Sequence, residues 1–238
     1  MKHAAQRFAN RLGYKITRLY GRDLSSELKE VVAAARPHTT TQNEAIVALH
    51  DAVRHIVATG VPGSFVECGV WKGGSLFVIA KTLAQLGVSD RQIFGFDTFS
   101  GMPAASDEDV RYDGMHGRDP TAMNLDAAPS ADRVRALVLT SGYPPDRLQL
   151  VQGRVEDTLP DAAPAEIALL RLDTDWYEST RHELEQLYPR LAPGGILIID
   201  DYGHWNGARQ ATDEYLAQLD RPPFLSRVDY TVRLAVKP

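Results

Sequence analysis

The sequence has a single cysteine, Cys68, so no disulfide can form within the chain, as is typical of proteins in a reducing compartment. No apolar run approaches the roughly 20 residues that a membrane-spanning helix needs. The net charge of −5 implies no broad basic surface, which argues against a nucleic-acid partner. These absences predict a cytoplasmic protein without an integral membrane segment. Cys68 itself lies in an apolar segment, and we expect a buried core residue rather than a nucleophile.

The N-terminus also lacks a secretory signal. Residues 1–22 are basic and mildly amphipathic, but they contain no continuous apolar stretch of the kind that a signal peptide carries. An accessory helix, a dimer arm and a weak membrane-surface contact all fit this pattern, and we favour the accessory helix. We therefore expect an N-terminal accessory helical segment over residues 1–42 and one catalytic domain over residues 43–238. A homodimer built with the N-terminal helices is consistent with this division.

Apolar strands alternate with helices along the rest of the chain. Strands are predicted at 64–70, 93–99, 148–151, 167–173 and 195–201. Helices are predicted at 43–59, 75–86, 178–191 and 208–219, and residues 193–195 predict a tight turn. Residues 225–236 show the alternation of a terminal hairpin. The pattern predicts an α/β fold: a mostly parallel seven-stranded sheet with helices on both faces and a C-terminal antiparallel hairpin.

Three aspartates follow two of these apolar strands. Asp173 ends the segment 167–173, and Asp200 and Asp201 follow the apolar run 195–199. An unpaired buried carboxylate costs several kcal/mol, and ligands of open α/β sheets bind at strand ends. Three converging oxygen ligands suit a hard cation such as Mg²⁺. The alternative is that Asp200 or Asp201 only caps a following helix.

A glycine-rich turn after the first strand points to a nucleoside. Residues 67–75 have the form E-x-G-x-x-x-G-x-S, which differs from the dinucleotide-binding G-x-G-x-x-G. Asp97 ends the second strand, where a carboxylate can accept both hydroxyls of a ribose. Together they indicate an adenosine-containing cofactor, while the missing third glycine and the missing phosphate loop argue against NAD and ATP.

Residues 100–129 do not follow the strand–helix rhythm. They are rich in Asp, Gly, Pro and Met, and they include Tyr112, His116 and Arg118. A long irregular segment in a compact domain is usually functional or disordered. We interpret it as a lid over the active site, with plain disorder as the alternative.

At these residues the chain resembles the class I S-adenosylmethionine-dependent methyltransferases. More narrowly, it is similar to the macrocin O-methyltransferase family, whose members methylate sugar hydroxyls. The matching segments are residues 65–75, 96–103, 170–175 and 193–202, and the resemblance covers the chain from about residue 61 onwards. It implies a Rossmann-like methyltransferase fold, S-adenosylmethionine and Mg²⁺ as cofactors, and a carbohydrate-containing acceptor.

The resemblance also implies roles for individual residues. Glu67 and Ser75 would hold the methionyl part of the cofactor, and Asp97 the ribose. The remaining cofactor-binding candidates are Gly69, Ser100, Gly153, Arg154, Val155 and Asp173. Asp173, Asp200 and Asp201 would bind Mg²⁺, and Asp175 would be the general base.

Alternatives remain open for several of these residues. Asp175 also suits the N-cap of the helix after it, and His116 and His204 compete with it as the base. Four aromatic residues after the strand ends line an acceptor site or pack at the sheet edge: Trp176, Tyr177, Tyr202 and Trp205.

The predicted activity is Mg²⁺-dependent methyl transfer from S-adenosylmethionine to a sugar hydroxyl of a glycoside or oligosaccharide. A catechol-type or phenolic O-methyltransferase and a non-catalytic adenosine-binding module are the alternatives.

Overall fold

The computed structural model describes residues 23–119, 121–122 and 129–238. Its centre is a seven-stranded sheet with the order β3-β2-β1-β4-β5-β7-β6, in which only β7 and β6 run antiparallel to their neighbours. The five parallel strands are β1 (Ser64–Cys68), β2 (Ile93–Asp97), β3 (Leu148–Gln152), β4 (Ile167–Leu172) and β5 (Leu191–Ile199). The terminal pair is β6 (Ser226–Arg227) and β7 (Arg233–Val236). The predicted mostly parallel sheet with its C-terminal hairpin is therefore confirmed.

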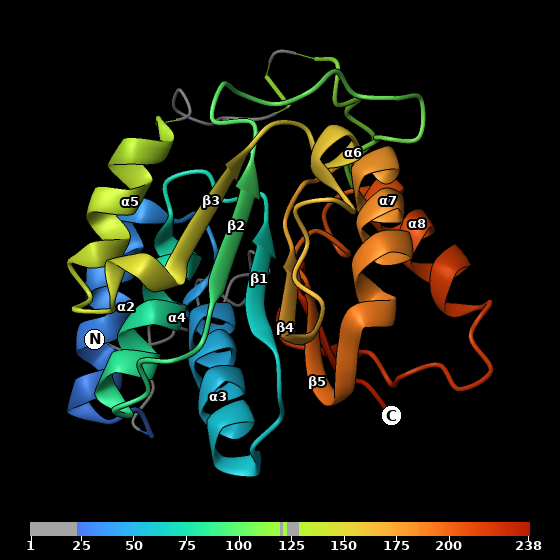
Figure 1. Ribbon diagram of the computed structural model, residues 1–238. Coiled ribbons are helices and arrows are strands. Elements are labelled where there is room, and N and C mark those ends of the chain that lie inside the picture. Colours follow the sequence, from blue (N-terminus) through green and yellow to red (C-terminus); the bar gives the residue numbers. More distant parts are fainter. Residues whose placement is uncertain (1–22, 120, 123–128) are drawn as a thin grey trace, which may run out of the picture.

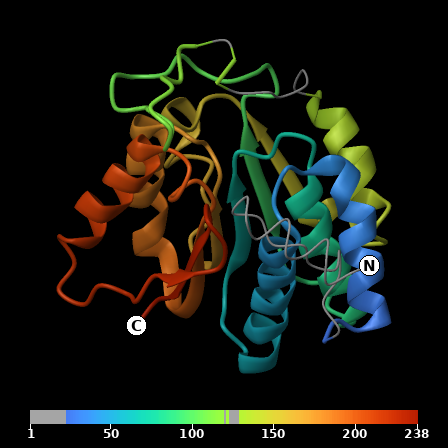
Figure 2. The ribbon, with the colours of Figure 1, turned by 180° about the vertical axis from the view of Figure 1, so that it is seen from behind.

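Helices cover both faces of the sheet (Figures 1 and 2). One face carries α2 (Ser26–Ala35), α3 (Asn43–Thr59), α4 (Gly74–Gln85) and α5 (Ala131–Leu139). The other carries α6 (Val155–Thr158), α7 (Tyr177–Leu187) and α8 (Asn206–Leu216). Short 3-10 turns, η1 (Arg36–His38), η2 (Pro145–Arg147) and η3 (Tyr188–Arg190), follow α2, precede β3 and follow α7. Because the central strands are buried on both faces, they read as continuous apolar runs.

Alternate residues of β1 enter two separate cores. In β1, Phe65 packs with the α2–α5 side, whereas Val66 and Cys68 pack with the α6–α8 side. Cys68 is fully buried, which confirms it as a core residue. The period-two alternation of a strand produces this division.

One local prediction is wrong. Residues 193–195 do not form a turn before the fifth strand, because β5 already begins at Leu191. Ile167 pairs with Leu191 and Leu169 pairs with Ile196, so the extra residues of β5 form a bulge within the strand. Gly194 has φ +79°, a conformation that favours glycine, so the glycines serve a bulge instead of a turn.

Residues 23–42, the described part of the N-terminal segment, pack on the same core as the helices that follow them. Residues 1–22, which include the predicted accessory helix and dimer arm, lie outside the described residues. In α2, Leu28, Val31, Val32 and Ala35 are buried in the core shared by α3 and α4. The division at residue 42 stays a prediction. No helix in the described ranges is long and apolar enough to cross a membrane.

The described part of the predicted lid lies over the carboxyl ends of the strands (Figure 1, green). It forms an antiparallel bridge between Val110 and His116 and another between Arg111 and Trp205. The indole N–H of Trp176 donates to the carbonyl of Pro103 at 3.0 Å, which fastens this segment to the end of β4. That the segment opens and closes as a lid stays a prediction.

Candidate active site at the carboxyl ends of the strands

A pocket of about 960 Å³ opens between the strand ends and the lid segment. Its walls come from residues 38–42, the turn after β1, and the residues that follow β2, β3, β4 and β5. Residues 101–105 and 117–119 of the lid segment also line it. The topology thus brings the predicted metal residues and most of the predicted cofactor residues to one cavity, as expected for an open α/β sheet.

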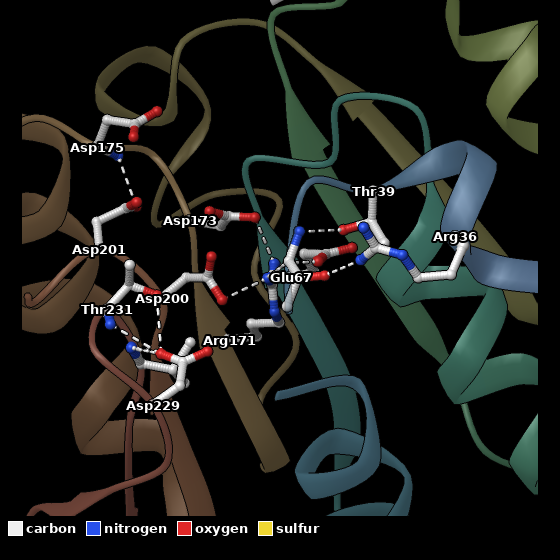
Figure 3. Close-up of polar contacts among 12 residues, drawn as sticks. Arg36, Thr39, Glu67, Arg171, Asp173, Asp175, Asp200, Asp201, Asp229 and Thr231 are labelled. Atoms are coloured by element: carbon white, nitrogen blue, oxygen red, sulfur yellow. Dashed lines mark hydrogen bonds and ion pairs between the residues drawn. The ribbon is translucent and has the colours of Figure 1, made fainter. Parts of the chain in front are cut away.

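The three predicted metal ligands converge (Figure 3). One carboxylate oxygen each from Asp173, Asp200 and Asp201 lies within 4.8 Å of the other two. Asp201 is buried and the other two are partly buried. Asp173 follows β4 and Asp200 and Asp201 follow β5, so strand pairing itself sets their separation. The suggestion that Asp200 or Asp201 caps a helix is not supported, because the N-cap of α8 is Trp205.

A buried arginine lies between this cluster and the first strand. Arg171 in β4 is 2% exposed, and its Nη1 lies 2.6 Å from both Glu67 Oε1 and Asp173 Oδ2. Its Nη2 lies 2.7 Å from Asp200 Oδ1 and donates to Thr41 Oγ1 at 3.2 Å. Sequence reasoning missed this residue, although a lone charge inside the apolar run 167–172 was a usable signal. One guanidinium therefore contacts three carboxylates that come from β1 and from the ends of β4 and β5.

The electrostatics of the cluster favour protons or cations. Burial raises the pKa of Asp173 and of Asp201 well above the usual aspartate range, and the neighbouring carboxylates raise both further. Burial, followed by the charge of Asp173, raises the pKa of Asp175 to about 7. Removing carboxylates from water disfavours their charged forms, and a divalent cation reverses that preference.

One carboxylate oxygen of Glu67 is buried and accepts no hydrogen bond from the described residues. Its Oε1 is paired with Arg171, but Oε2 has no hydrogen-bond partner among the described residues. Burial raises the pKa of Glu67 to about 7 despite the nearby guanidinium. A buried acceptor without a donor is costly, so this atom suits a ligand that brings an N–H group.

Asp97 ties the turn after β1 to the end of β2. Its Oδ2 accepts from the backbone N–H of Val70 at 2.7 Å and of Trp71 at 2.9 Å, and its Oδ1 accepts from Phe99 at 2.7 Å. Trp71 has φ +45°, so this carboxylate holds a strained turn in place. Asp97 lines the pocket, and its contact with a ribose stays a prediction.

The other predicted cofactor residues divide into two groups. Most of them line the pocket: Gly69, Ser75, Gly153, Arg154, Val155 and Asp173. Ser100 is exposed and is not among the lining residues, because the chain turns away after Thr98 and returns to the pocket at Gly101. The structure therefore does not bring Ser100 to the wall.

Two glycines are required by close backbone approaches. A Cβ atom on Gly69, which has φ +79°, would lie 1.9 Å from the carbonyl oxygen of Asp173. A Cβ atom on Gly74 would lie 2.6 Å from the carbonyl oxygen of His38, where the N-terminal segment crosses the start of α4. Gly69 of the E-x-G-x-x-x-G-x-S pattern and the adjacent Gly74 thus let three chain segments meet at the pocket.

Asp175 lies on a tight turn beside the acid cluster and does not cap α7. Its φ is +65°, and its N–H donates to Asp201 Oδ2 at 3.1 Å. The N-cap of α7 is Trp176, and the N–H of Tyr177 donates to Asp109 Oδ1 at 2.7 Å. Asp109, a buried residue of the lid segment that sequence reasoning overlooked, therefore performs the capping expected of Asp175.

The two histidines differ in position. His204 lines the pocket, and its Nδ1 lies 3.1 Å from the hydroxyl of Tyr230. Burial lowers the pKa of His204, which favours its neutral form. His116 accepts from the N–H of Arg118 and is not among the residues lining the pocket.

The four predicted aromatic residues also separate. Trp176 and Trp205 are almost wholly buried and pack edge to face, 4.9 Å apart, at the pocket wall. The hydroxyls of Tyr177 and Tyr202 donate to Glu214 and Asp213 of α8, and neither ring is among those that line the pocket. Packing therefore explains the burial of the two tryptophans. Only the parts of Trp176 and Trp205 that line the pocket can contact an acceptor.

Comparisons with known proteins match most of the chain. The family model described as macrocin-O-methyltransferase (TylF) matches residues 15–234. A tetracenomycin relative from Streptomyces olivaceus, named 8-demethyl-8-(2,3-dimethoxy-alpha-L-rhamnosyl)-tetracenomycin-C 4'-O-methyltransferase, is 36% identical over 90% of this chain and 77% of its own length. The demethyldecarbamoylnovobiocin O-methyltransferase of Streptomyces niveus is 33% identical over 82% of this chain and 74% of its own. Among solved structures, the O-methyltransferase NovP superposes with a TM-score of 0.75 at 29% identity, covering 91% of this chain and 90% of NovP.

Proposed function

The chain belongs to the macrocin O-methyltransferase family and has the class I methyltransferase fold, and on that premise we propose that it moves a methyl group from S-adenosylmethionine to a sugar hydroxyl with the help of Mg²⁺. That it is an S-adenosylmethionine-dependent O-methyltransferase follows from the family and from its relatives. The proposal of a sugar acceptor and a Mg²⁺ ion rests on the convergence of Asp173, Asp200 and Asp201 in the pocket that Asp97 also lines.

Residues in and beneath the pocket suit the cofactor. The unpartnered Oε2 of Glu67 would accept an N–H from the charged amino group of the methionyl part. Gly69 brings the turn after β1 close to the backbone at Asp173, and Gly153, Arg154 and Val155 also line the pocket. When bound, S-adenosylmethionine supplies an electrophilic methyl group on a sulfonium.

The acid cluster fits a hard divalent cation. Its donor set is three carboxylates, all oxygen ligands, within 4.8 Å of one another, and burial makes their unneutralised negative charge costly. A cation held by Asp173, Asp200 and Asp201 would lower the pKa of an acceptor hydroxyl and orient it. Arg171, in contact with Asp173 and Asp200, would keep their carboxylates aimed at that position.

In this proposal Asp175 acts as the base. Its backbone N–H is fixed by Asp201, and its carboxylate faces the same pocket. With a pKa raised to about 7, it is a better proton acceptor than an ordinary aspartate. Asp175 would take the proton of the acceptor hydroxyl as the oxygen forms its bond to the methyl carbon and the carbon–sulfur bond breaks. His204 also lines the pocket, but its ring is already engaged with Tyr230.

The relatives favour a sugar over a phenol as the acceptor. One of them is named as the 4'-O-methyltransferase of a rhamnosyl-bearing tetracenomycin. Mycinamicin III 3''-O-methyltransferase of Micromonospora griseorubida, 33% identical over 75% of this chain and 70% of its own length, is a third relative. These names support a glycoside acceptor, and a phenolic acceptor remains the alternative to be assayed beside it.

The test is transfer of a labelled methyl group to panels of glycosides, oligosaccharides and phenols, with Mg²⁺ and with a chelator. We expect chelator-sensitive labelling of a sugar. Asp173→Asn should abolish transfer while changing the dissociation constant of S-adenosylhomocysteine less than threefold. If only phenols were labelled, the acceptor would be a phenol and not a sugar. Full activity in the presence of the chelator would refute the role of the cation.

A further inference from the structure

Glu183 is a fully buried acid that the proposed reaction does not use. It lies in α7 and is 0% exposed. On the printed sequence it looks like an ordinary surface acid of a charged helix, yet its neighbours at this depth are Leu184 and Leu187 of the α6–α8 core. An acid in such a place costs several kcal/mol unless it has a partner.

The partner of Glu183 is the turn that carries the catalytic acids. The hydroxyl of Thr174 donates to Glu183 Oε2 at 3.1 Å, and Oε1 has no hydrogen-bond partner among the described residues. Burial raises the pKa of Glu183 well above the usual range. Thr174 lies between Asp173, a predicted metal ligand, and Asp175, the proposed base.

This turn has a conformation that needs support. Asp175 has φ +65°, and the N–H of Trp176 donates to the carbonyl of Thr174 at 2.7 Å, which is the pattern of a strained three-residue turn. The N–H of Asp173 donates to the carbonyl of Cys68 at 2.9 Å, and Asp201 holds the N–H of Asp175. Thr174 is the only residue of the three whose side chain is anchored, among the described residues, in the helix behind the turn.

We propose that Glu183 is a positioning residue that fixes the turn of Asp173, Thr174 and Asp175 through its contact with the Thr174 hydroxyl. The inference rests on the proposed function, since it assigns to Glu183 the placement of the base and of one metal ligand. A displacement of about 1 Å at reacting groups is enough to lower a rate by as much as 100-fold.

The experiment compares wild type with Glu183→Leu, Glu183→Gln, Thr174→Val and the double variant Glu183→Leu/Thr174→Val. Thr82→Val is the matched control, because its buried hydroxyl donates to the carbonyl of Val78 within α4. Two properties are measured in the full chain: the kinetics of methyl transfer, and hydrogen–deuterium exchange of the peptide covering residues 173–177, with residues 206–216 as the internal reference.

We expect Glu183→Leu and Thr174→Val each to lower kcat about tenfold or more, with the KM for S-adenosylmethionine within twofold of wild type. The double variant should lose no more than the larger single loss, and Glu183→Gln, which keeps an acceptor oxygen, should retain most of the activity. Exchange at residues 173–177 should be about tenfold faster in both single variants and unchanged in Thr82→Val.

Additive losses in the double variant, or unchanged exchange at residues 173–177, would overturn the proposal. The exchange measurement needs no acceptor. It therefore decides the role of Glu183 even if wild type transfers no methyl group to any carbohydrate, an outcome that would count against the proposed function alone.

Discussion

Arg171 Nη1 lies 2.6 Å from Glu67 Oε1, and both side chains are at most 2% exposed, so β1 and β4 are joined by a buried ion pair beneath the pocket. Removing the guanidinium of Arg171 would leave Glu67, Asp173 and Asp200 without the positive charge that all three contact. Because breaking a buried pair strands the remaining charge, we expect Arg171→Met to lower the free energy of unfolding by about 3–5 kcal/mol. Urea denaturation in the presence of a chelator measures this loss.

The control for that variant is Arg181→Met, which breaks an exposed pair with Glu185 on α7. An exposed helical pair contributes only about 0.3–0.5 kcal/mol. If Arg171→Met and Arg181→Met lowered the free energy of unfolding equally, the buried pair would contribute no more to stability than the exposed one.

Gly69→Ala should destabilise the protein far more than Gly60→Ala, although both glycines have a left-handed backbone conformation. Its Cβ would lie 1.9 Å from the Asp173 carbonyl oxygen, whereas a Cβ on Gly60, with φ +69°, meets nothing within 4 Å. We expect Gly60→Ala to cost about 1–2 kcal/mol from the left-handed conformation alone. Gly69→Ala should cost more and also weaken S-adenosylhomocysteine binding at least tenfold, as measured by thermal unfolding and calorimetry. Matching effects of the two variants would contradict the argument from the close approach.

Asp109 joins the lid segment to α7. Its Oδ2 accepts from the N–H and the hydroxyl of Ser106 at 2.6 and 2.7 Å, while Oδ1 accepts from Tyr177. Asp109→Ala removes a helix cap, which costs about 0.5–2 kcal/mol, and releases the lid segment. We expect faster limited proteolysis within residues 101–119 and a raised KM for the acceptor, with cofactor affinity unchanged. Ser106→Ala, which keeps the cap on α7, should show a smaller change, and a larger one would be inconsistent with this role.

Proton and metal binding should compete at the acid cluster. The folded-state pKa values of Glu67 and Asp175 are raised to about 7, from ordinary values of 4.5 and 3.8. Groups whose pKa is raised by folding stabilise the protein below their ordinary pKa, and this contribution is lost as the pH rises through about 7. In a chelator, these groups should therefore lower the free energy of unfolding between pH 4.5 and 7.5.

Added Mg²⁺ should show the opposite trend, because its ligands must be deprotonated. The gain in Tm on adding Mg²⁺ should be larger at pH 8 than at pH 6 and absent in Asp173→Asn. A gain that is independent of pH, or one that survives in Asp173→Asn, would show that the ion binds elsewhere.

The sequence predicted the parts of the fold and of the site that follow the regular alternation of strands and helices. The apolar runs of β1, β4 and β5 predicted parallel strands, and the acids at their ends were predicted to meet, as they do. Arg171, Glu183 and Asp109 were not anticipated, because burial of a charged residue depends on which helix or loop covers it after folding. The turn predicted at residues 193–195 failed for a related reason: Gly and Pro mark irregular backbone, but whether this becomes a turn or a bulge depends on the partner strand.

Residues 38–42 complete one wall of the pocket, with the His38 carbonyl against Gly74 and the Thr41 hydroxyl on Arg171. A fragment beginning at residue 43 would keep every recognisable motif and still have an incomplete cofactor site. We therefore expect the docking of α2 on α4 and the affinity for the cofactor to be linked, so that ligand binding would also report whether residues 23–42 have folded onto the sheet.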